Sequence, residues 1–346
     1  MGINELYKET EDLGFEYRTR YLNSIEQFIK KGYEKARANR CTPEKLSANR
    51  EEYREQYKEM LGIPASDGTF PTVKKNYVGK DGLCEIYRLS IEVREDFYFY
   101  GMLFVPHIAE NAPLVIAQHG GGGSPEFCSD MYGENNYSGF TKRALKKGAV
   151  VFAPQILVWG FGGNTGENKP DFNISYDRGK IDRELKHLGY SITGLEIFCI
   201  MRSLDYLLTL EEIDENRVGM MGLSYGGFYS MYTAGTDTRI KAIYSAAAFN
   251  DRSKVCFTDW MWQNSANMFF DAEVAGLCAP RKLWIDVGKN DAVFDYSPSV
   301  NEGERAKQFY KAAGAEQNIV YNLWDGAHKF DENSGGFDFF FKAVFE

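Results

Sequence analysis

The sequence predicts an α/β fold: a doubly wound, mostly parallel sheet with an N-terminal helical extension. Short, continuous apolar runs alternate with segments of helical periodicity along residues 114–323. Continuous apolar runs are typical of central parallel strands, because such strands are buried on both faces. Strands and helices that alternate in this way favour right-handed crossovers. One apolar run ends directly in a serine flanked by glycines, which indicates a tight turn from a strand into a helix.

The strands are predicted from two patterns. Residues 87–94 alternate apolar and polar side chains, as expected for a half-exposed strand at the antiparallel edge of a mixed sheet, and a second strand over 97–105 ends at Pro106. Continuous apolar runs predict the buried strands at 114–117, 149–153, 218–223, 240–248, 282–287 and 318–323. Between them, helices are predicted at 195–208, where apolar residues form a stripe, and at 302–315.

The N-terminal part, residues 1–65, is predicted to be a helical extension of the α/β domain, which spans residues 66–346. Its apolar residues repeat at helical spacing among charged ones: Tyr21, Ile25, Phe28 and Ile29. The extension contains no obvious chemical group, so we interpret it as a packing or oligomerisation element. A homo-oligomer is expected to form through these helices.

Composition excludes several kinds of partner. A chain with a net charge of −9 lacks the clustered Lys and Arg that hold a phosphate backbone, so no nucleic acid is expected. No apolar stretch approaches the ~18 residues that span a membrane. The N-terminus shows no secretory signal, and the six cysteines include no Cys-x-x-Cys pair. We therefore expect a cytoplasmic protein with reduced thiols.

The serine motif is Gly222-Leu223-Ser224-Tyr225-Gly226. An apolar strand precedes it and an apolar helical segment, residues 228–232, follows it. In that setting Gly-x-Ser-x-Gly indicates a nucleophile elbow, in which a sharp turn exposes the serine Oγ at the top of a sheet. The pattern alone arises readily by chance, so the interpretation depends on the partners of Ser224.

A serine hydroxyl needs a base that accepts its proton. Among four histidines, His107 has no acidic or glycine context and His187 lies in a charged helical stretch, while His119 opens a glycine run. His328 lies in a loop directly after the last predicted strand. Because open α/β sheets place their chemistry at the carboxyl ends of strands, we predict that His328 is the base.

The acid that orients the base is expected after the preceding strand, 282–287. Asp286 lies within that strand, where it would be buried, whereas Asp291 lies in the following loop at the same edge as the serine turn. Asp291 is therefore the predicted acid, with Asp295 and Asp251 as alternatives.

Backbone N–H groups are expected to stabilise the negative charge that develops on a carbonyl oxygen. One donor is predicted to be Tyr225, immediately after the serine, and the others Gly121 and Gly122 in the run His119–Gly123. Any of the four glycines can serve. A phosphate-binding loop is excluded by the spacing, because no Gly-Lys-Ser/Thr follows.

Several segments carry a resemblance to a known family: Gly101–Pro106, His119–Gly121, Glu211–Gly219, the elbow, and Ala279–Arg281 before Gly288 and Asp291. With the chain order Ser, Asp, His, they resemble the α/β-hydrolase superfamily over about residues 70–346. Within it, the chain is similar to bacterial acyl esterases of the acetyl xylan esterase and dienelactone-hydrolase-like type. The resemblance implies a serine hydrolase of carboxylic esters that uses neither a metal nor another cofactor. A dienelactone hydrolase proper has Cys as its nucleophile, and Ser224 departs from that pattern.

The function hypotheses are three. The first is a serine esterase that removes short, acetyl-type acyl groups, including those of carbohydrates. The second is an aminopeptidase- or oligopeptidase-like serine hydrolase, because the elbow with Tyr after Ser also resembles the prolyl oligopeptidase group; that group carries a propeller domain, which residues 1–65 cannot form. The third is a non-catalytic binding protein on the same fold.

Aromatic residues in the predicted loops bear on the substrate. Aromatic rings can stack on sugars, so Trp159, Trp260 and Trp262, together with His119, are predicted to contact a small-molecule or oligosaccharide ester. The alternative for each of them is packing in the core or in a lid. Glu196, on a predicted helix, is interpreted as a residue behind the substrate contacts, as a residue at the rim of the site, or as part of a solvated helix face.

Overall fold

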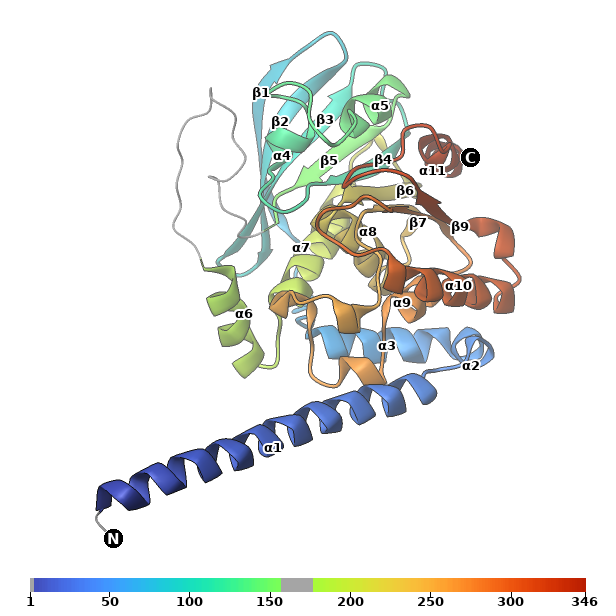
Figure 1. Ribbon diagram of the computed structural model, residues 1–346. Helices are drawn as coiled ribbons and strands as arrows, with labels where there is room; N and C mark the ends of the chain where they lie inside the picture. The colour runs from blue at the N-terminus through green and yellow to red at the C-terminus, as the bar shows by residue number, and fades with distance from the viewer. Residues whose placement is uncertain (1–2, 157–176) are drawn as a thin grey trace.

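The computed structural model describes residues 3–156 and 177–346 (Figure 1). Its strands are β1 Thr72–Lys80, β2 Cys84–Arg94, β3 Phe97–Pro106, β4 Ala112–Gln118, β5 Val150–Pro154, β6 Ile213–Leu223, β7 Ile240–Ala246, β8 Lys282–Gly288 and β9 Ile319–Trp324. Its α-helices are α1 Ile3–Ala38, α2 Pro43–Ala48, α3 Arg50–Leu61, α4 Pro125–Cys128, α5 Phe140–Lys146, α6 Arg178–His187, α7 Ile192–Leu207, α8 Tyr225–Thr236, α9 Asp271–Cys278, α10 Ser297–Ala312 and α11 Gly336–Phe345.

The described strands form one mixed sheet in the order β1-β2-β3-β5-β4-β6-β7-β8-β9. The neighbouring strands β1, β2, β3 and β5 pair antiparallel. The neighbouring strands β5, β4, β6, β7, β8 and β9 pair parallel. The predicted doubly wound, mostly parallel sheet with an antiparallel edge is confirmed. The edge strand β1 was not predicted. Its sequence, TVKKNYVGK, has two lysines next to each other and mostly exposed or half-exposed side chains, which is typical of an edge protected against further pairing.

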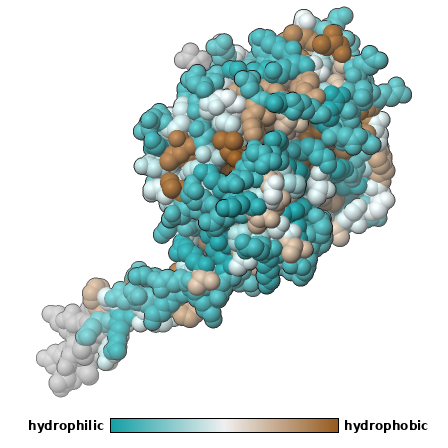
Figure 2. Space-filling view, turned by 90° about the vertical axis from the view of Figure 1, so that its right-hand side faces the viewer, coloured by the Kyte–Doolittle hydropathy of each residue, from teal (hydrophilic) through white to brown (hydrophobic). Residues whose placement is uncertain are grey.

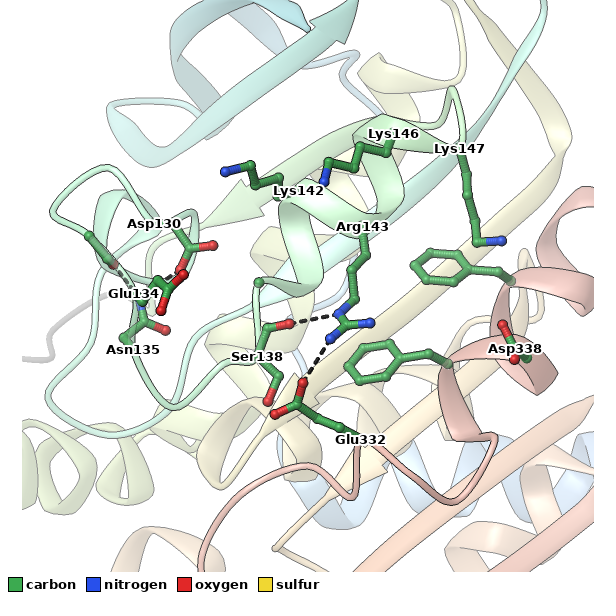
Figure 3. Close-up of a pocket in the computed structure, with 14 residues that line it drawn as sticks. Asp130, Glu134, Asn135, Ser138, Lys142, Arg143, Lys146, Lys147, Glu332 and Asp338 are labelled. Carbon is green, nitrogen blue, oxygen red and sulfur yellow. Dashed lines mark hydrogen bonds and ion pairs between the residues drawn. The ribbon is translucent and has the colours of Figure 1, made fainter.

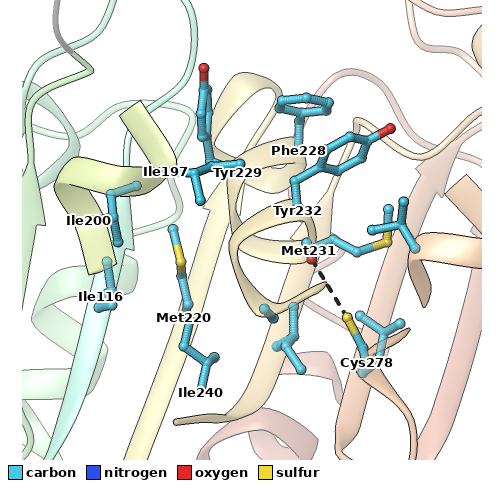
Figure 4. Close-up of a cluster of buried hydrophobic side chains, with 14 of the residues drawn as sticks. Ile116, Ile197, Ile200, Met220, Phe228, Tyr229, Met231, Tyr232, Ile240 and Cys278 are labelled. Carbon is cyan, nitrogen blue, oxygen red and sulfur yellow. Dashed lines mark hydrogen bonds between the residues drawn. The ribbon is translucent and has the colours of Figure 1, made fainter. Parts of the chain in front are cut away.

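Helices cover both faces of the sheet, and this explains the continuous apolar runs. Along β5, Val150 and Phe152 pack in a core shared with α7, α8, α9 and α10, whereas Val151 and Ala153 pack against α5 and α11. Figure 4 shows part of the first of these cores, where Met220 of β6 and Ile197 of α7 lie beside α8. Since successive side chains of a strand point to opposite faces, a strand covered on both sides has to be apolar throughout.

The N-terminal helices are joined to the body in different ways. In α3, Tyr57 and Leu61 are fully buried in the main core, and the Tyr57 ring lies 5.9 Å from that of Tyr232 on α8. By contrast, α1 projects from the body, and residues 15–32 are all exposed (Figures 1 and 2). The division into domains at residue 65 falls between α3 and β1 and stays a prediction. Within the described ranges, no helix is long and apolar enough to cross a membrane.

Candidate active site

The turn at Ser224 joins β6 directly to α8. Ser224 has φ +59° and ψ −122°, a positive φ that a non-glycine residue rarely adopts, and its side chain does not cap α8. A Cβ on Gly222 would lie 2.3 Å from the carbonyl carbon of Gly226, and a Cβ on Gly226 would lie 2.1 Å from the oxygen of Gln118. The turn is therefore possible only because both flanking residues are glycines. Such a strained, sterically enforced turn leaves Ser224 Oγ at the carboxyl edge of the sheet.

The glycine run follows β4, the parallel neighbour of β6, so it lies beside the serine turn. A Cβ on Gly120 would lie 3.2 Å from that of Ser224. The Gly120 N–H donates to Tyr137 Oη at 2.6 Å, and the Gly123 N–H donates to the Gly120 oxygen at 3.1 Å. Among the described residues, the N–H groups of Gly121 and Gly122 have no acceptor. This arrangement favours the predicted pair of donors over the other two glycines.

His119 holds this loop from inside the protein. Its side chain is fully buried; Nε2 accepts the N–H of Ile156 at 3.1 Å, which leaves the proton on Nδ1 for the Gly120 oxygen at 2.8 Å. Burial lowers the pKa of His119 to about 4, so the ring is neutral at physiological pH. The position corrects the expectation that His119 contacts the substrate, because both ring nitrogens are already bound within the protein.

His328 and Asp291 meet at the same edge. His328 Nδ1 lies 2.7 Å from Asp291 Oδ2, and the side chains are 21% and 3% exposed. The loops after β8 and β9 run side by side, since the Asn290 N–H donates to the Gly326 oxygen at 2.9 Å. Burial raises the pKa of Asp291, but its hydrogen bonds to His328 and to the Val293 N–H outweigh burial, so its pKa lies below the usual value.

The other carboxylates that the sequence offered are engaged elsewhere. Asp286 is fully buried in β8, where it accepts hydrogen bonds from Tyr244, Trp284 and Asn322, and from the N–H of Asp331. Asp295 accepts from Ser297, and Asp251 pairs with Arg37 on α1 at 3.0 Å. Of the four candidates, Asp291 is the one bonded to His328.

The ring of Tyr225 belongs to a cluster of buried aromatic side chains beneath the serine turn. This cluster, which we call the aromatic floor, also contains Phe228, Trp260 and Trp262. The Tyr225 ring lies 4.6 Å from the ring of Trp260, which stacks on Phe228 at 4.3 Å. Trp262 stacks at 6.4 Å on the same Phe228 ring and donates its Nε1 hydrogen to Ser191. Trp260 and Trp262 are 2% and 8% exposed. These positions correct the prediction that the two tryptophans contact substrate, because their faces are already covered by protein. Trp159 lies outside the described residues.

A buried charged network lies behind this floor, and most of its members were not predicted. Arg178 binds Glu196 through two hydrogen bonds of 2.6 and 2.7 Å and binds Asp259 at 2.8 Å. Asp259 in turn accepts the Tyr225 hydroxyl at 3.1 Å. Glu196 is 1% exposed and bound to Arg178, which excludes a rim or a solvated face and agrees with the interpretation that it lies behind the substrate contacts. An isolated Arg or Asp in a sequence has no signal that distinguishes such a network from surface charge.

A separate pocket of about 760 Å³ lies between the loop 130–139, α5 and α11 (Figure 3). Its lining mixes acidic and basic side chains, and Arg143 bridges it by binding the Ser138 oxygen at 2.8 Å and Glu332 at 2.7 Å. None of the predicted site residues lines it. In the part of the chain that the structure describes, no group of three His, Cys, Asp or Glu side chains is placed to hold a metal ion.

Comparisons with known proteins match part of this chain to a family and its fold to solved structures. Residues 199–282, which include the elbow, match the prolyl oligopeptidase family, Peptidase_S9. "Putative hydrolase YtaP" of Bacillus subtilis (strain 168) is 26% identical over 191 residues, which are 52% of this chain and 60% of that protein's length. The chain therefore spans less than two thirds of this curated relative.

Solved structures share the fold. A putative acetyl xylan esterase from Bacteroides fragilis NCTC 9343 superposes with a TM-score of 0.67 at 16% identity, over 87% of this chain and 82% of that one. A glucuronoyl esterase from Solibacter usitatus gives a TM-score of 0.63 at 16% identity, over 86% and 92% of the two chains. Together with the strand order, these likenesses show that the chain has the α/β-hydrolase fold.

Proposed function

We propose that the chain is a serine carboxylic-ester hydrolase with Ser224 as nucleophile, His328 as base and Asp291 as the orienting acid. The observation that carries the proposal is the 2.7 Å contact between His328 Nδ1 and Asp291 Oδ2 at the sheet edge where the strained turn holds Ser224. With Nδ1–H bound to the carboxylate, Nε2 is the ring nitrogen left to accept a proton.

The reaction follows from these positions. Ser224 Oγ attacks the ester carbonyl while its proton passes to His328 Nε2, and the carbonyl oxygen becomes an oxyanion. His328 then gives the proton to the departing alcohol, and an acyl group remains on Ser224. A water molecule, activated by the same nitrogen, releases the acid and regenerates the hydroxyl. We assign the oxyanion donors to the backbone N–H of Tyr225, the first residue of α8, and to Gly121 and Gly122.

For the substrate, we propose short acyl esters, of the acetyl type, on a carbohydrate alcohol. The support is the likeness in fold to proteins named as acetyl xylan and glucuronoyl esterases. Trp159 stays a predicted contact to the sugar. Because Trp260 and Trp262 are covered by protein, they are assigned to the floor of the site instead.

The test is a panel of p-nitrophenyl esters of increasing acyl length, with acetylated xylo-oligosaccharides beside them. Wild-type enzyme is expected to prefer acetyl over longer chains, and Ser224→Ala is expected to lose activity on every ester. A fluorophosphonate probe should label the wild type and not the variant. If the folded wild-type protein is not labelled and hydrolyses no ester, the catalytic proposal is wrong and a binding protein on the same fold is favoured.

A peptidase is the second candidate, since residues 199–282 match the prolyl oligopeptidase family. Aminoacyl and prolyl p-nitroanilides measure this activity directly. A kcat/KM on these amides above that on acetyl esters would favour the peptidase, and Ser224→Ala again serves as the control.

A further inference from the structure

Helix α1 has an exposed apolar face that nothing in the described protein covers. Seven large apolar side chains are 38% to 80% exposed: Phe15, Tyr17, Tyr21, Leu22, Ile25, Phe28 and Ile29. Phe15, Leu22, Ile25 and Ile29 are separated by intervals of seven, three and four residues, the spacing that places side chains on one side of a helix. Single exposed apolar residues are common on protein surfaces, but a continuous face of this kind marks an interaction site.

The same face is buried where α1 reaches its own body. Ala36, seven residues beyond Ile29, is 2% exposed, and Arg37 anchors this end of the helix to Asp251 and Ser253 at 3.0 and 2.6 Å. The exposed stripe therefore continues a surface that already packs against protein. Figure 2 shows α1 extending away from the body.

The exposed apolar area of these seven side chains is about the area that a second helix of the same kind would bury. Four of the seven side chains are aromatic, and aromatic side chains carry about 150–250 Å² each. At these exposed fractions, the seven together present on the order of 800 Å², which is close to the share of each partner in a standard protein–protein interface.

The charges of α1 set the direction of the pairing. Residues 3–16 contain five acidic residues and one basic residue, a net charge of −4, whereas residues 17–38 contain six basic and two acidic residues, a net charge of +4. Two such helices attract when they lie antiparallel, because each acidic half then faces a basic half. In a parallel pair, like charges would face each other along the whole length.

We propose that the chain forms a homodimer in which α1 packs antiparallel against α1 of a second copy. The exposed run from Phe15 to Ile29 is centred on Leu22, so the two helices cross there and cover the apolar faces of both copies. This inference is independent of the proposed hydrolase activity, since α1 contributes no predicted catalytic residue.

Light scattering after size exclusion, on the full chain at micromolar concentration, tests the dimer. The wild type is expected to have the mass of two chains, and Leu22→Glu the mass of one. Gln27→Glu adds the same charge on the opposite side of α1 and is expected to stay dimeric. Since residues 15–32 are all exposed, far-ultraviolet circular dichroism and thermal melting of the body should be unchanged in both variants. A monomeric wild type, or a Leu22→Glu variant as dimeric as Gln27→Glu, would overturn the proposal.

Spin-label distances test the direction. Labels are placed on Asn23→Cys and, separately, Lys31→Cys, with the exposed Cys256 and half-buried Cys41 replaced by Ser. At ~1.5 Å per residue, antiparallel pairing about Leu22 separates the two labels along the axis by about 3 Å at position 23 and about 27 Å at position 31. A parallel dimer gives the same distance at both positions, and that result would contradict the antiparallel arrangement.

Discussion

Replacing Asp291 by asparagine changes the charge beside His328 while keeping the shape of the side chain. Asp291 Oδ1 accepts the N–H groups of Val293 and Phe294 at 2.7 and 3.2 Å, and Oδ2 receives His328 Nδ1. The two backbone donors require an oxygen opposite them, so the amide nitrogen of the new side chain is directed to His328. An NH₂ group can only donate to Nδ1, which forces the ring proton onto Nε2, where the base must be unprotonated.

The magnitude follows from this change of tautomer. The same substitution in a Ser-His-Asp triad lowers kcat by about 10⁴-fold, or about 5 kcal/mol of transition-state stabilisation. The Asp291 side chain is only 3% exposed, so water cannot replace the lost carboxylate. Because the pKa of Asp291 is lowered, its carboxylate is ionised from about pH 5 upward, and the loss is expected to be the same across the neutral and alkaline range.

The assay is kcat for p-nitrophenyl acetate between about pH 5 and pH 9, the range in which the triad carboxylate stays ionised. Asp295→Asn is the matched control, since Asp295 lies in the same loop, is exposed, and accepts hydrogen bonds from Ser297 rather than from a histidine. Its kcat should stay close to that of the wild type. An Asp291→Asn enzyme with wild-type kcat would refute the reasoning, and so would an equal loss in Asp295→Asn.

Three further predictions concern stability. Gly226→Ala places a Cβ 2.1 Å from a backbone oxygen at the end of β4 and is expected to abolish soluble, active protein. As a control, a Cβ on Gly79 would meet no atom within 4 Å, so Gly79→Ala should express and hydrolyse esters normally. The pKa of His119 is about 4 in the fold, against 6.5 for the ordinary side chain. The stabilisation by the neutral ring is therefore fully present above pH 6.5. Up to about 3 kcal/mol of the free energy of unfolding is lost as the pH falls towards 4. The free energy of unfolding in urea should therefore fall more steeply over this range in the wild type than in His119→Gln; equal slopes would contradict the assignment. In the wild type, the buried Arg252 guanidinium is bound to Asp271 at 2.5 Å. Asp271→Asn removes this counter-charge and is expected to lower the free energy of unfolding by about 3–5 kcal/mol in the same measurement. An unchanged unfolding midpoint would show that the pair does not stabilise the fold.

The predicted positions of Ser224, Asp291 and His328 follow from chain order and parallel topology. Each residue comes directly after an apolar run, and the carboxyl ends of parallel strands necessarily lie at one edge of a sheet. The structure places all three in the turn or loops after β6, β8 and β9, and it brings Asp291 and His328 into hydrogen-bond contact. The glycines of the serine turn were equally predictable, since the space available there admits no Cβ.

The structure overturned predictions that placed particular side chains at the surface of the site. Tryptophan at 260 and 262 fits a loop that stacks on sugars as well as a packed floor, and only the placement of Phe228 beneath them distinguishes the two. His119 was interpreted as a substrate contact because it adjoins the glycine run, but its ring points inward to the N–H of Ile156, which follows a different strand.

The sequence by itself determined the sheet, the serine turn and the order of the site residues, because these depend on local apolar periodicity, on steric limits at glycine and on the polarity of strands. Tertiary structure alone decided which polar and aromatic side chains are buried. Arg178, Glu196 and Asp259 come from three separate segments. Their charges are stable in the interior only because the fold brings Arg178 within 2.6 Å of Glu196 and 2.8 Å of Asp259. Burial depends on what packs against a residue from distant parts of the chain, and no local pattern records that.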